Sequence, residues 1–247
     1  GISVEDFDSV VQALLRARPE VVINCVGIVK QRPEAEDSVT SIAVNSLFPH
    51  RLARLCRVAG ARLIHLSTDC VFSGKAGNYS ESAPADPVDL YGRTKLLGEL
   101  HYEHALTVRT SMIGRELCTS YGLLEWFLGQ KGRSVSGYKR AVFSGLTTPS
   151  LAEIVAWIVR EQPELHGVWH VASEPISKFD LLSLVNRVYD LGIEIVPDDT
   201  VVCNRSLDGA RFKQATGYVP PGWPEMIEDM RNDPTPYDRM RRPSAHR

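Results

Sequence analysis

A tyrosine and a lysine four residues apart are the side chains best suited to chemistry in this sequence. They are Tyr91 and Lys95, within LYGRTKLLGE at positions 90–99. On a helix, residues four apart lie on one face, so the phenol and the ammonium would stand side by side. A phenol has an ordinary pKa near ~10, and a neighbouring ammonium favours its ionised form. The spacing therefore predicts that Lys95 lowers the pKa of Tyr91, which would suit acid–base catalysis near neutral pH.

A second polar group lies at the end of an apolar run. In LSTDCVFSG, at positions 66–74, Thr68 and Asp69 come where the strand-like ARLIHLS ends. In a parallel sheet, ligands bind beyond the carboxyl ends of the strands. The segments NCVG (24–27) and TSMIG (110–114) hold equivalent places after two other apolar runs. We expect these three strand ends and the tyrosine helix to meet at one crevice.

The elements that must position these residues alternate between helix and strand. Apolar runs predict three buried strands, at 21–27, 61–67 and 106–114. Amphipathic patterns predict helices at 3–20 and 38–60, and a further helix holds the tyrosine–lysine pair. Such alternation is typical of an α/β fold with a doubly wound parallel sheet and right-handed crossovers.

The regular alternation loosens beyond Gly114. We therefore expect a sheet domain at 1–113 and a smaller, mixed α/β domain at 114–247 that folds over the carboxyl ends of the strands. Arg140 and Arg205 lie in this second part, and arginine suits bidentate contacts with phosphate. Each of the two is equally well explained as an ordinary surface arginine.

The composition argues against several classes of partner. With 28 basic and 30 acidic residues, no overall charge favours nucleic acid or a membrane surface. No apolar run approaches the ~20 residues that span a bilayer. The five cysteines are scattered and show no metal-ligand spacing. We expect a cytoplasmic protein with reduced thiols and no metal site.

Several motifs, in this order, resemble those of the extended short-chain dehydrogenase/reductase family. They are AVN at 43–45, STDCVF at 67–72, YGRTK at 91–95, RTSMIG at 109–114 and GVWHVAS at 167–173. The segment STDCVF is most similar to the STDYVFxG pattern of dTDP-4-dehydrorhamnose reductases and related sugar-nucleotide reductases. The resemblance implies a Rossmann-type dinucleotide-binding domain, a substrate domain, NADPH or NADH as cofactor, and a 4-keto sugar nucleotide as substrate. It also suggests a possible homodimer.

The resemblance also implies roles for individual residues. Tyr91 would be the general acid, Lys95 would hold the nicotinamide ribose, and Thr68 would hydrogen-bond the substrate oxygen. Ser67, one position earlier on the strand, should point the other way. Cofactor contacts are expected from Asn24, Cys25, Val26, Gly27, Asn45, Tyr91, Lys95 and Met112. Substrate contacts are expected from Thr68, Asp69, Cys70, Arg140 and Arg205.

Asn45 carries a separate expectation, because Pro49 follows it by four residues. Proline has no N–H, so it leaves the Asn45 carbonyl without its helical donor and should kink the helix. The resemblance implies that this asparagine supports a water leading to the active-site lysine. A kink used only for packing is equally consistent with the sequence.

One family feature is not found in these 247 residues: no GxxGxxG loop occurs, and the first predicted element is a helix. The first βαβ portion of the fold is therefore expected to be missing from this chain, and the pyrophosphate-binding residues cannot be named.

Alternative functions stay open. The chain could be a sugar-nucleotide epimerase or dehydratase, or a non-catalytic regulatory subunit resembling the β subunit of methionine adenosyltransferase. Dehydratases of this family follow the hydroxyl residue with an Asp-Glu pair, whereas here Asp69 is followed by Cys70. This difference favours a reductase.

Overall fold

A four-stranded parallel sheet forms the centre of the protein. The structure is a computed structural model that describes residues 1–240. The sheet has the order β1-β2-β3-β8, and its strands are Val21–Asn24, Arg62–Leu66, Ala105–Arg109 and Gly167–His170. Every neighbouring pair is parallel. The predicted α/β class with a parallel sheet is confirmed.

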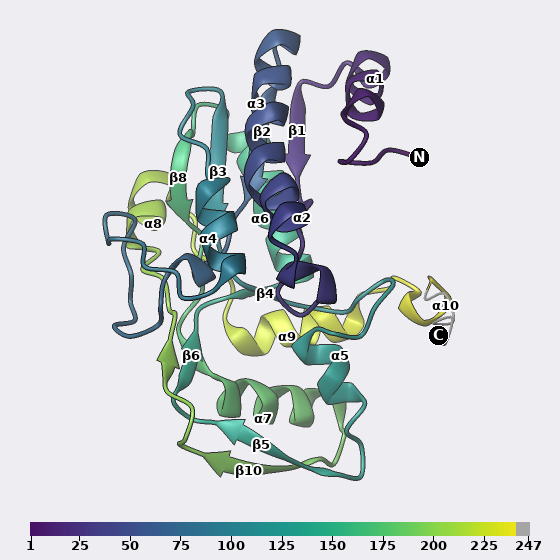
Figure 1. The fold of residues 1–247 in the computed structure, drawn as a ribbon. Coiled ribbons are helices and arrows are strands. Elements are labelled where there is room, and N and C mark those ends of the chain that lie inside the picture. Colours follow the sequence, from purple (N-terminus) through teal and green to yellow (C-terminus); the bar gives the residue numbers. More distant parts are fainter. Residues whose placement is uncertain (241–247) are drawn as a thin grey trace.

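Helices cover both faces of this sheet (Figure 1). Leu63 and Ile64, consecutive in β2, are both fully buried, but they belong to different apolar clusters. The Leu63 cluster includes side chains of α1 (Phe7–Ala17) and α3 (Phe48–Ala59), and the Ile64 cluster includes side chains of α6 (Thr148–Glu161). Alternate strand residues thus bury opposite faces, as a doubly wound sheet requires.

The strands are shorter than the sequence predicts. β1 ends at Asn24, because the Asn24 side chain accepts a hydrogen bond from Val26 N (3.1 Å) and turns the chain. The predicted strand 106–114 is two strands, since the chain leaves the sheet after Arg109. Its second part, β4 (Met112–Ile113), pairs instead with β7 (Leu146–Thr147).

The predicted helix 38–60 is interrupted in the turn before Pro49. It consists of α2 (Ser38–Ser41), the π-helical segment η2 (Ile42–Leu47) and α3. Phe48 N donates to Ala43 O, five residues back rather than four. Such a π-bulge adds a residue to one turn. The sequence located the irregularity, but it did not show its form.

The second half of the chain supplies smaller elements and one strand of the main sheet. These elements are α5 (Leu123–Leu128), β5 (Ser134–Tyr138), β6 (Ala141–Phe143), β9 (Ile176–Ser177), α7 (Lys178–Tyr189), β10 (Glu194–Asp198), β11 (Cys203–Asn204), α8 (Ala210–Thr216), α9 (Trp223–Asn232) and α10 (Tyr237–Met240). The first half also contains η1 (Pro33–Glu36), η3 (Asp69–Val71) and α4 (Leu90–Leu97). β5, β10, α5 and α7 lie beyond the end of the sheet toward which β1 points (Figure 1). The predicted domain boundary lies at residue 113. The main sheet contains strands from both sides of this boundary, because β8 pairs with β3.

No helix within residues 1–240 is long and apolar enough to cross a membrane. In the same part of the chain, no three His, Cys, Asp or Glu side chains are grouped so that they could hold a metal ion.

Candidate active site

Tyr91 and Lys95 both line one cavity, as their spacing on a helix predicts. They lie on α4, whose first turn is capped by Asp89: its carboxylate accepts a hydrogen bond from Gly92 N (2.8 Å). The cavity has a volume of about 430 Å³. A cavity of this size fits part of a dinucleotide or a small ligand.

The cavity lies at the carboxyl ends of the strands and is largely apolar. Its lining residues are Ile23, Cys25, Val26, Gly27, Val29, Leu66, Ser67, Tyr91, Lys95, Met112, Thr148, Leu151, Ala152, Val155 and Ala156. The predicted cofactor residues Cys25, Val26, Gly27 and Met112 are therefore brought together with the tyrosine–lysine pair. The α6 side of the wall was not predicted, because it comes from a helix 50 or more positions along the chain.

Asn24 supports the cavity from behind its wall. Its side chain is buried, shares a hydrogen bond with His65 Nδ1 (3.0 Å) and accepts one from Val26 N. Asn24 therefore shapes the loop that follows β1, whereas the next three residues form the surface of the cavity.

Lys95 directs its ammonium toward the end of β2. Its Nζ donates a hydrogen bond to Leu66 O (2.6 Å). Burial lowers the pKa of Lys95 to about 8, and the charges of Glu99 and Cys25 oppose that shift. An ammonium has three donors, so the bond to Leu66 leaves two for a ligand.

Tyr91 differs from the sequence expectation. Burial raises the pKa of Tyr91 above its ordinary value, the charge of Cys70 adds to the rise, and a hydrogen bond with Thr68 opposes it. The expected lowering by Lys95 does not prevail, because removal of the phenol from water raises the pKa and the nearby charges of Cys70, Asp69 and Asp89 add to the rise. The phenol is thus protonated at neutral pH, which is the form that donates a proton.

Thr68 lies beside Tyr91 at the end of β2. It caps η3 by accepting a hydrogen bond from Cys70 N (3.1 Å), and this bond fixes its side chain. Ser67 lines the cavity, which Thr68 does not, and its Oγ donates to Glu99 Oε1 (2.7 Å). Strand alternation predicted this difference between the two hydroxyls.

Asn45 clamps the loop that follows β1. Its side chain accepts a hydrogen bond from Ile28 N (2.9 Å) and donates to Ile28 O (3.0 Å). A Cβ at Gly27 would stand 3.3 Å from Asn45 Oδ1, so this loop passes close to the asparagine. The Asn45 carbonyl lies against Gly98, where a Cβ would stand 2.0 Å from the oxygen. The packing explains why α4 ends in a glycine.

Charged and polar side chains gather around Asp69, the residue that follows Thr68. Asp69 is buried, and burial raises its pKa while the charges of Lys178 and Arg205 oppose the rise. Arg205 Nε donates to Phe72 O (2.9 Å), which fixes the guanidinium beside this loop. Burial and the charge of Asp69 raise the pKa of Cys70 to about 11, so its thiol is protonated.

Lys178 belongs to this group and was not identified from the sequence. It is the first residue of α7, and its Nζ lies 3.6 Å from the centre of the Phe143 ring. Burial lowers the pKa of Lys178 to about 8, and the charge of Asp69 opposes that shift. Its neighbour Ser177 does cap the helix, accepting a hydrogen bond from Asp180 N (3.0 Å). That cap predicts the start of the helix but not its approach to Asp69.

Arg140 does not join either group. It lies exposed between β5 and β6, and its carbonyl accepts a hydrogen bond from Cys203 N (3.0 Å).

A parallel sheet with a hydroxyl, a tyrosine and a lysine at its carboxyl edge defines the extended short-chain dehydrogenase/reductase class. Within that class, the model of the RmlD substrate binding domain matches residues 2–233. The chain belongs to this family.

Similar proteins include reductases and a methionine adenosyltransferase subunit. A dTDP-4-dehydrorhamnose reductase from Streptomyces griseus is 38% identical over 99 residues, which are 40% of this chain and 33% of that protein. The methionine adenosyltransferase 2 subunit beta of Danio rerio is 37% identical over 95 residues, 38% of this chain and 28% of that protein. The matched segments thus span about a third of these curated relatives.

Solved structures share the fold over a much longer stretch. The dTDP-4-dehydrorhamnose reductase of Bacillus anthracis, in complex with NADP, superposes with a TM-score of 0.82 at 20% identity. The match covers 95% of this chain and 87% of that one. At this identity the likeness shows the fold, which agrees with the sheet order and helix layers described above.

Proposed function

We propose that this chain belongs to an NAD(P)H-dependent reductase of a 4-keto sugar nucleotide. The observation that carries the proposal is the meeting of Tyr91, Lys95 and the loop 25–27 on the wall of one cavity, with Thr68 beside Tyr91. The dTDP-4-dehydrorhamnose reductases among its relatives support this substrate class. The NADP bound to a structure of the same fold supports the cofactor.

The cavity residues fit a nicotinamide nucleotide. Gly27 lines the cavity, and its missing side chain lets the loop pass close to Asn45 and Lys95. Ile23, Val26 and Met112 supply apolar surface for a flat ring, and the free donors of Lys95 suit ribose hydroxyls. When bound, the reduced nicotinamide supplies the hydride.

The protein's own groups supply the proton and hold the carbonyl. The protonated Tyr91 is placed to give its proton to the substrate oxygen, and Thr68 is placed to donate a hydrogen bond to the same oxygen. The Lys95 ammonium would stabilise the phenolate as the proton leaves. The water expected between the Asn45 carbonyl and Lys95 stays part of the proposal.

The substrate side is assigned to the charged group around Asp69. Asp69, Cys70, Lys178 and Arg205 would contact the sugar and its phosphates, and Arg140 would take no part because it is exposed elsewhere. We also propose residues 1–113 as chiefly cofactor-binding and 114–247 as chiefly substrate-binding. A homodimer and a cytoplasmic location stay predictions.

The test is to incubate the full-length protein separately with two nucleotide sugars. With a dTDP-4-keto-6-deoxy sugar and NADPH or NADH, we expect oxidation of the cofactor. With dTDP-glucose we expect no 4-keto product, because the protonated thiol of Cys70 is a poor replacement for a glutamate. A 4-keto product formed from dTDP-glucose, together with no cofactor oxidation in the reaction with the 4-keto sugar, would indicate a dehydratase instead.

A regulatory subunit is the second candidate, favoured by the 37% identity to a methionine adenosyltransferase subunit. Its test is binding to a methionine adenosyltransferase catalytic subunit, with a change in that enzyme's activity. Such an effect, together with no reduction of any 4-keto nucleotide sugar, would replace the reductase proposal.

A further inference from the structure

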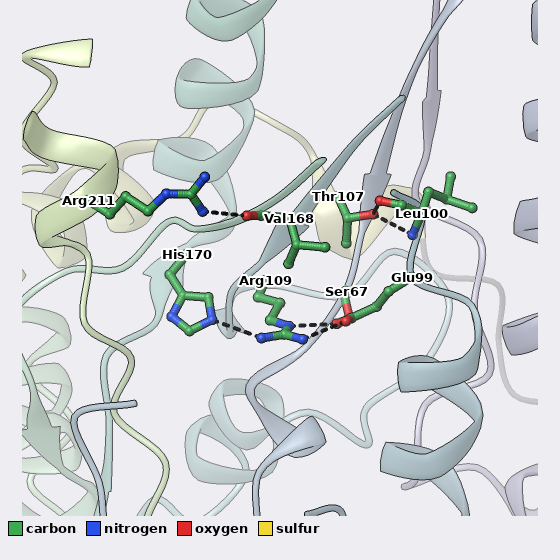
Figure 2. Close-up of polar contacts among 8 residues, drawn as sticks. All are labelled: Ser67, Glu99, Leu100, Thr107, Arg109, Val168, His170 and Arg211. Carbon is green, nitrogen blue, oxygen red and sulfur yellow. Dashed lines mark hydrogen bonds and ion pairs between the residues drawn. The ribbon is translucent and has the colours of Figure 1, made fainter. Parts of the chain in front are cut away.

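A buried carboxylate, Glu99, lies just beyond the end of α4 and has no part in the mechanism above. Ser67 Oγ and Arg109 Nε both donate to its Oε1 (2.7 and 2.8 Å), and Arg109 Nη2 donates to its Oε2 (2.7 Å). Only 1% of the Glu99 side chain and 7% of the Arg109 side chain is exposed. In Figure 2 the Arg109 guanidinium faces the Glu99 carboxylate, with Ser67 next to it.

His170 fixes the opposite side of Arg109. Arg109 Nη1 lies 3.3 Å from His170 Nε2, and His170 Nδ1 lies 3.0 Å from Tyr79 O. Burial and the charge of Arg109 lower the pKa of His170 to about 4, so the ring is neutral at neutral pH. Because a guanidinium only donates, Nε2 accepts and Nδ1 donates to the Tyr79 carbonyl. The guanidinium therefore has one orientation, toward Glu99 (Figure 2).

This cluster meets Lys95 at the end of β2. Leu66 O accepts the hydrogen bond of Lys95, and the next residue, Ser67, donates to Glu99. Glu99 and Cys25 are the groups whose charges raise the pKa of Lys95, and Glu99 acts more strongly. Burial raises the pKa of Cys25, which leaves its thiol protonated. His65 packs on the same side from β2, and burial and Lys95 keep its pKa well below the usual value, so it is neutral.

We propose that Glu99 is a positioning residue for Lys95: its carboxylate, held by Ser67 and Arg109, keeps the Lys95 ammonium charged at the cavity wall. Burial of an ammonium disfavours its charged form, and a fixed anion within the protein offsets part of that cost. The importance of this charge for catalysis rests on the proposed function. The charge itself can be measured without turnover.

The test is a titration of Lys95 in the full-length protein by NMR, with lysine labelled with ¹³C at Cε and the Lys95 signal assigned from Lys95→Arg. We expect a midpoint near pH 8 in the unchanged protein. In Glu99→Gln the midpoint should fall by at least about one unit. The alkaline limb of kcat/KM should move to lower pH by the same amount.

The matched control is Glu125→Gln. Glu125, on α5, is also a buried carboxylate, with 3% of its side chain exposed. Its Oε1 lies 2.7 Å from Arg115 Nε. This control should lower stability without moving the Lys95 midpoint. Because Glu99→Gln leaves the buried Arg109 without its anion, the double variant Glu99→Gln/Arg109→Leu is measured as well.

A Lys95 midpoint that stays near pH 8 in a folded Glu99→Gln or double variant would overturn the inference. A shifted midpoint in a protein that reduces no 4-keto nucleotide sugar would support the role of Glu99 and contradict the proposed function alone.

Discussion

Two lysines, the buried Lys95 and the partly buried Lys178, have the same lowered pKa of about 8 but reach it in different ways. Lys95 lies one helical turn from Tyr91, and a hydrogen bond to Leu66 O fixes its ammonium. Lys178 lies over the Phe143 ring, beside Asp69, from which it is separated by more than 100 positions of sequence. A local motif built the first environment, and tertiary packing built the second.

The comparison suggests that the two lysines lie at binding sites for different ligands. The Lys95 side is a largely apolar cavity formed by strand ends and α6. The Lys178 side gathers an acid, a thiol and an arginine. We therefore expect changes on the first side to affect the cofactor, and changes on the second side to affect the sugar nucleotide.

The largest effect is expected where the two sides meet. Tyr91→Phe removes the proton donor and should lower kcat by about 10²–10⁴-fold, the usual contribution of a general acid. Cofactor affinity, measured by fluorescence titration, should stay within about twofold, because this change removes only one hydroxyl. Tyr102→Phe is the matched control, since Tyr102 is exposed and pairs with His50 instead. Equal turnover in both variants would exclude Tyr91 as the acid.

Lys95→Met should weaken cofactor binding and, in the same protein, raise stability. The folded-state pKa of Lys95 is lowered from 10.5 to about 8, so below pH 8 its charge reduces the free energy of unfolding. That loss is recovered as the pH rises from about 8 to 10.5, where the unfolded chain binds more protons. At pH 7 we expect a gain of roughly 1–3 kcal/mol, measured by urea denaturation.

The control for Lys95→Met is Lys139→Met, a change at a side chain that is 50% exposed. It should alter neither stability nor cofactor affinity. If Lys95→Met destabilised the protein, the Leu66 hydrogen bond would outweigh the cost of burying the ammonium.

Lys178→Met should weaken binding of the sugar nucleotide rather than of the cofactor. We expect the KM for the sugar nucleotide to rise about tenfold, the effect of losing one charged hydrogen bond, while the KM for the cofactor stays constant. Steady-state kinetics with each substrate varied in turn separates the two, and Lys213→Met, an exposed lysine of α8, is the control. A higher KM for the cofactor instead would end the proposed division between the two lysines.

The smallest effect is expected at Arg140. Because it is exposed between β5 and β6, Arg140→Ala should change the KM for the sugar nucleotide by less than about twofold. Arg205→Ala, measured beside it, should change that KM more, since Arg205 is held against Phe72 O. The reverse order would move the substrate site toward β5.

The sequence predicted the parts of the site that depend on local rules. Helical spacing brought Tyr91 and Lys95 to one cavity, strand alternation separated Ser67 from Thr68, and Pro49 marked the irregular helix. These features follow from periods of 3.6 and 2 residues and from a missing N–H. The strand ends at 24–27 and 112 were predicted as well, because parallel strands finish at one edge.

The rest depends on long-range packing. Nothing near Lys178 in the sequence indicates that β6, β9 and β11 bring it to Asp69. Arg109 meets His170 only once β3 and β8 pair. The raised pKa of Tyr91 was missed for the same reason: spacing gives the nearest charge, whereas burial depends on the whole fold.

The central claim is that this protein reduces a sugar carbonyl at C4 with Tyr91 as the acid. The most direct measurement uses NADPH or NADH deuterated at C4 of the nicotinamide, a dTDP-4-keto-6-deoxy sugar, and mass spectrometry with NMR of the product. We predict a 4-hydroxy product with one deuterium at C4 of the sugar, and almost none of this product with Tyr91→Phe. A sugar returned without deuterium at C4, or labelled equally by the Tyr91→Phe variant, would contradict the account.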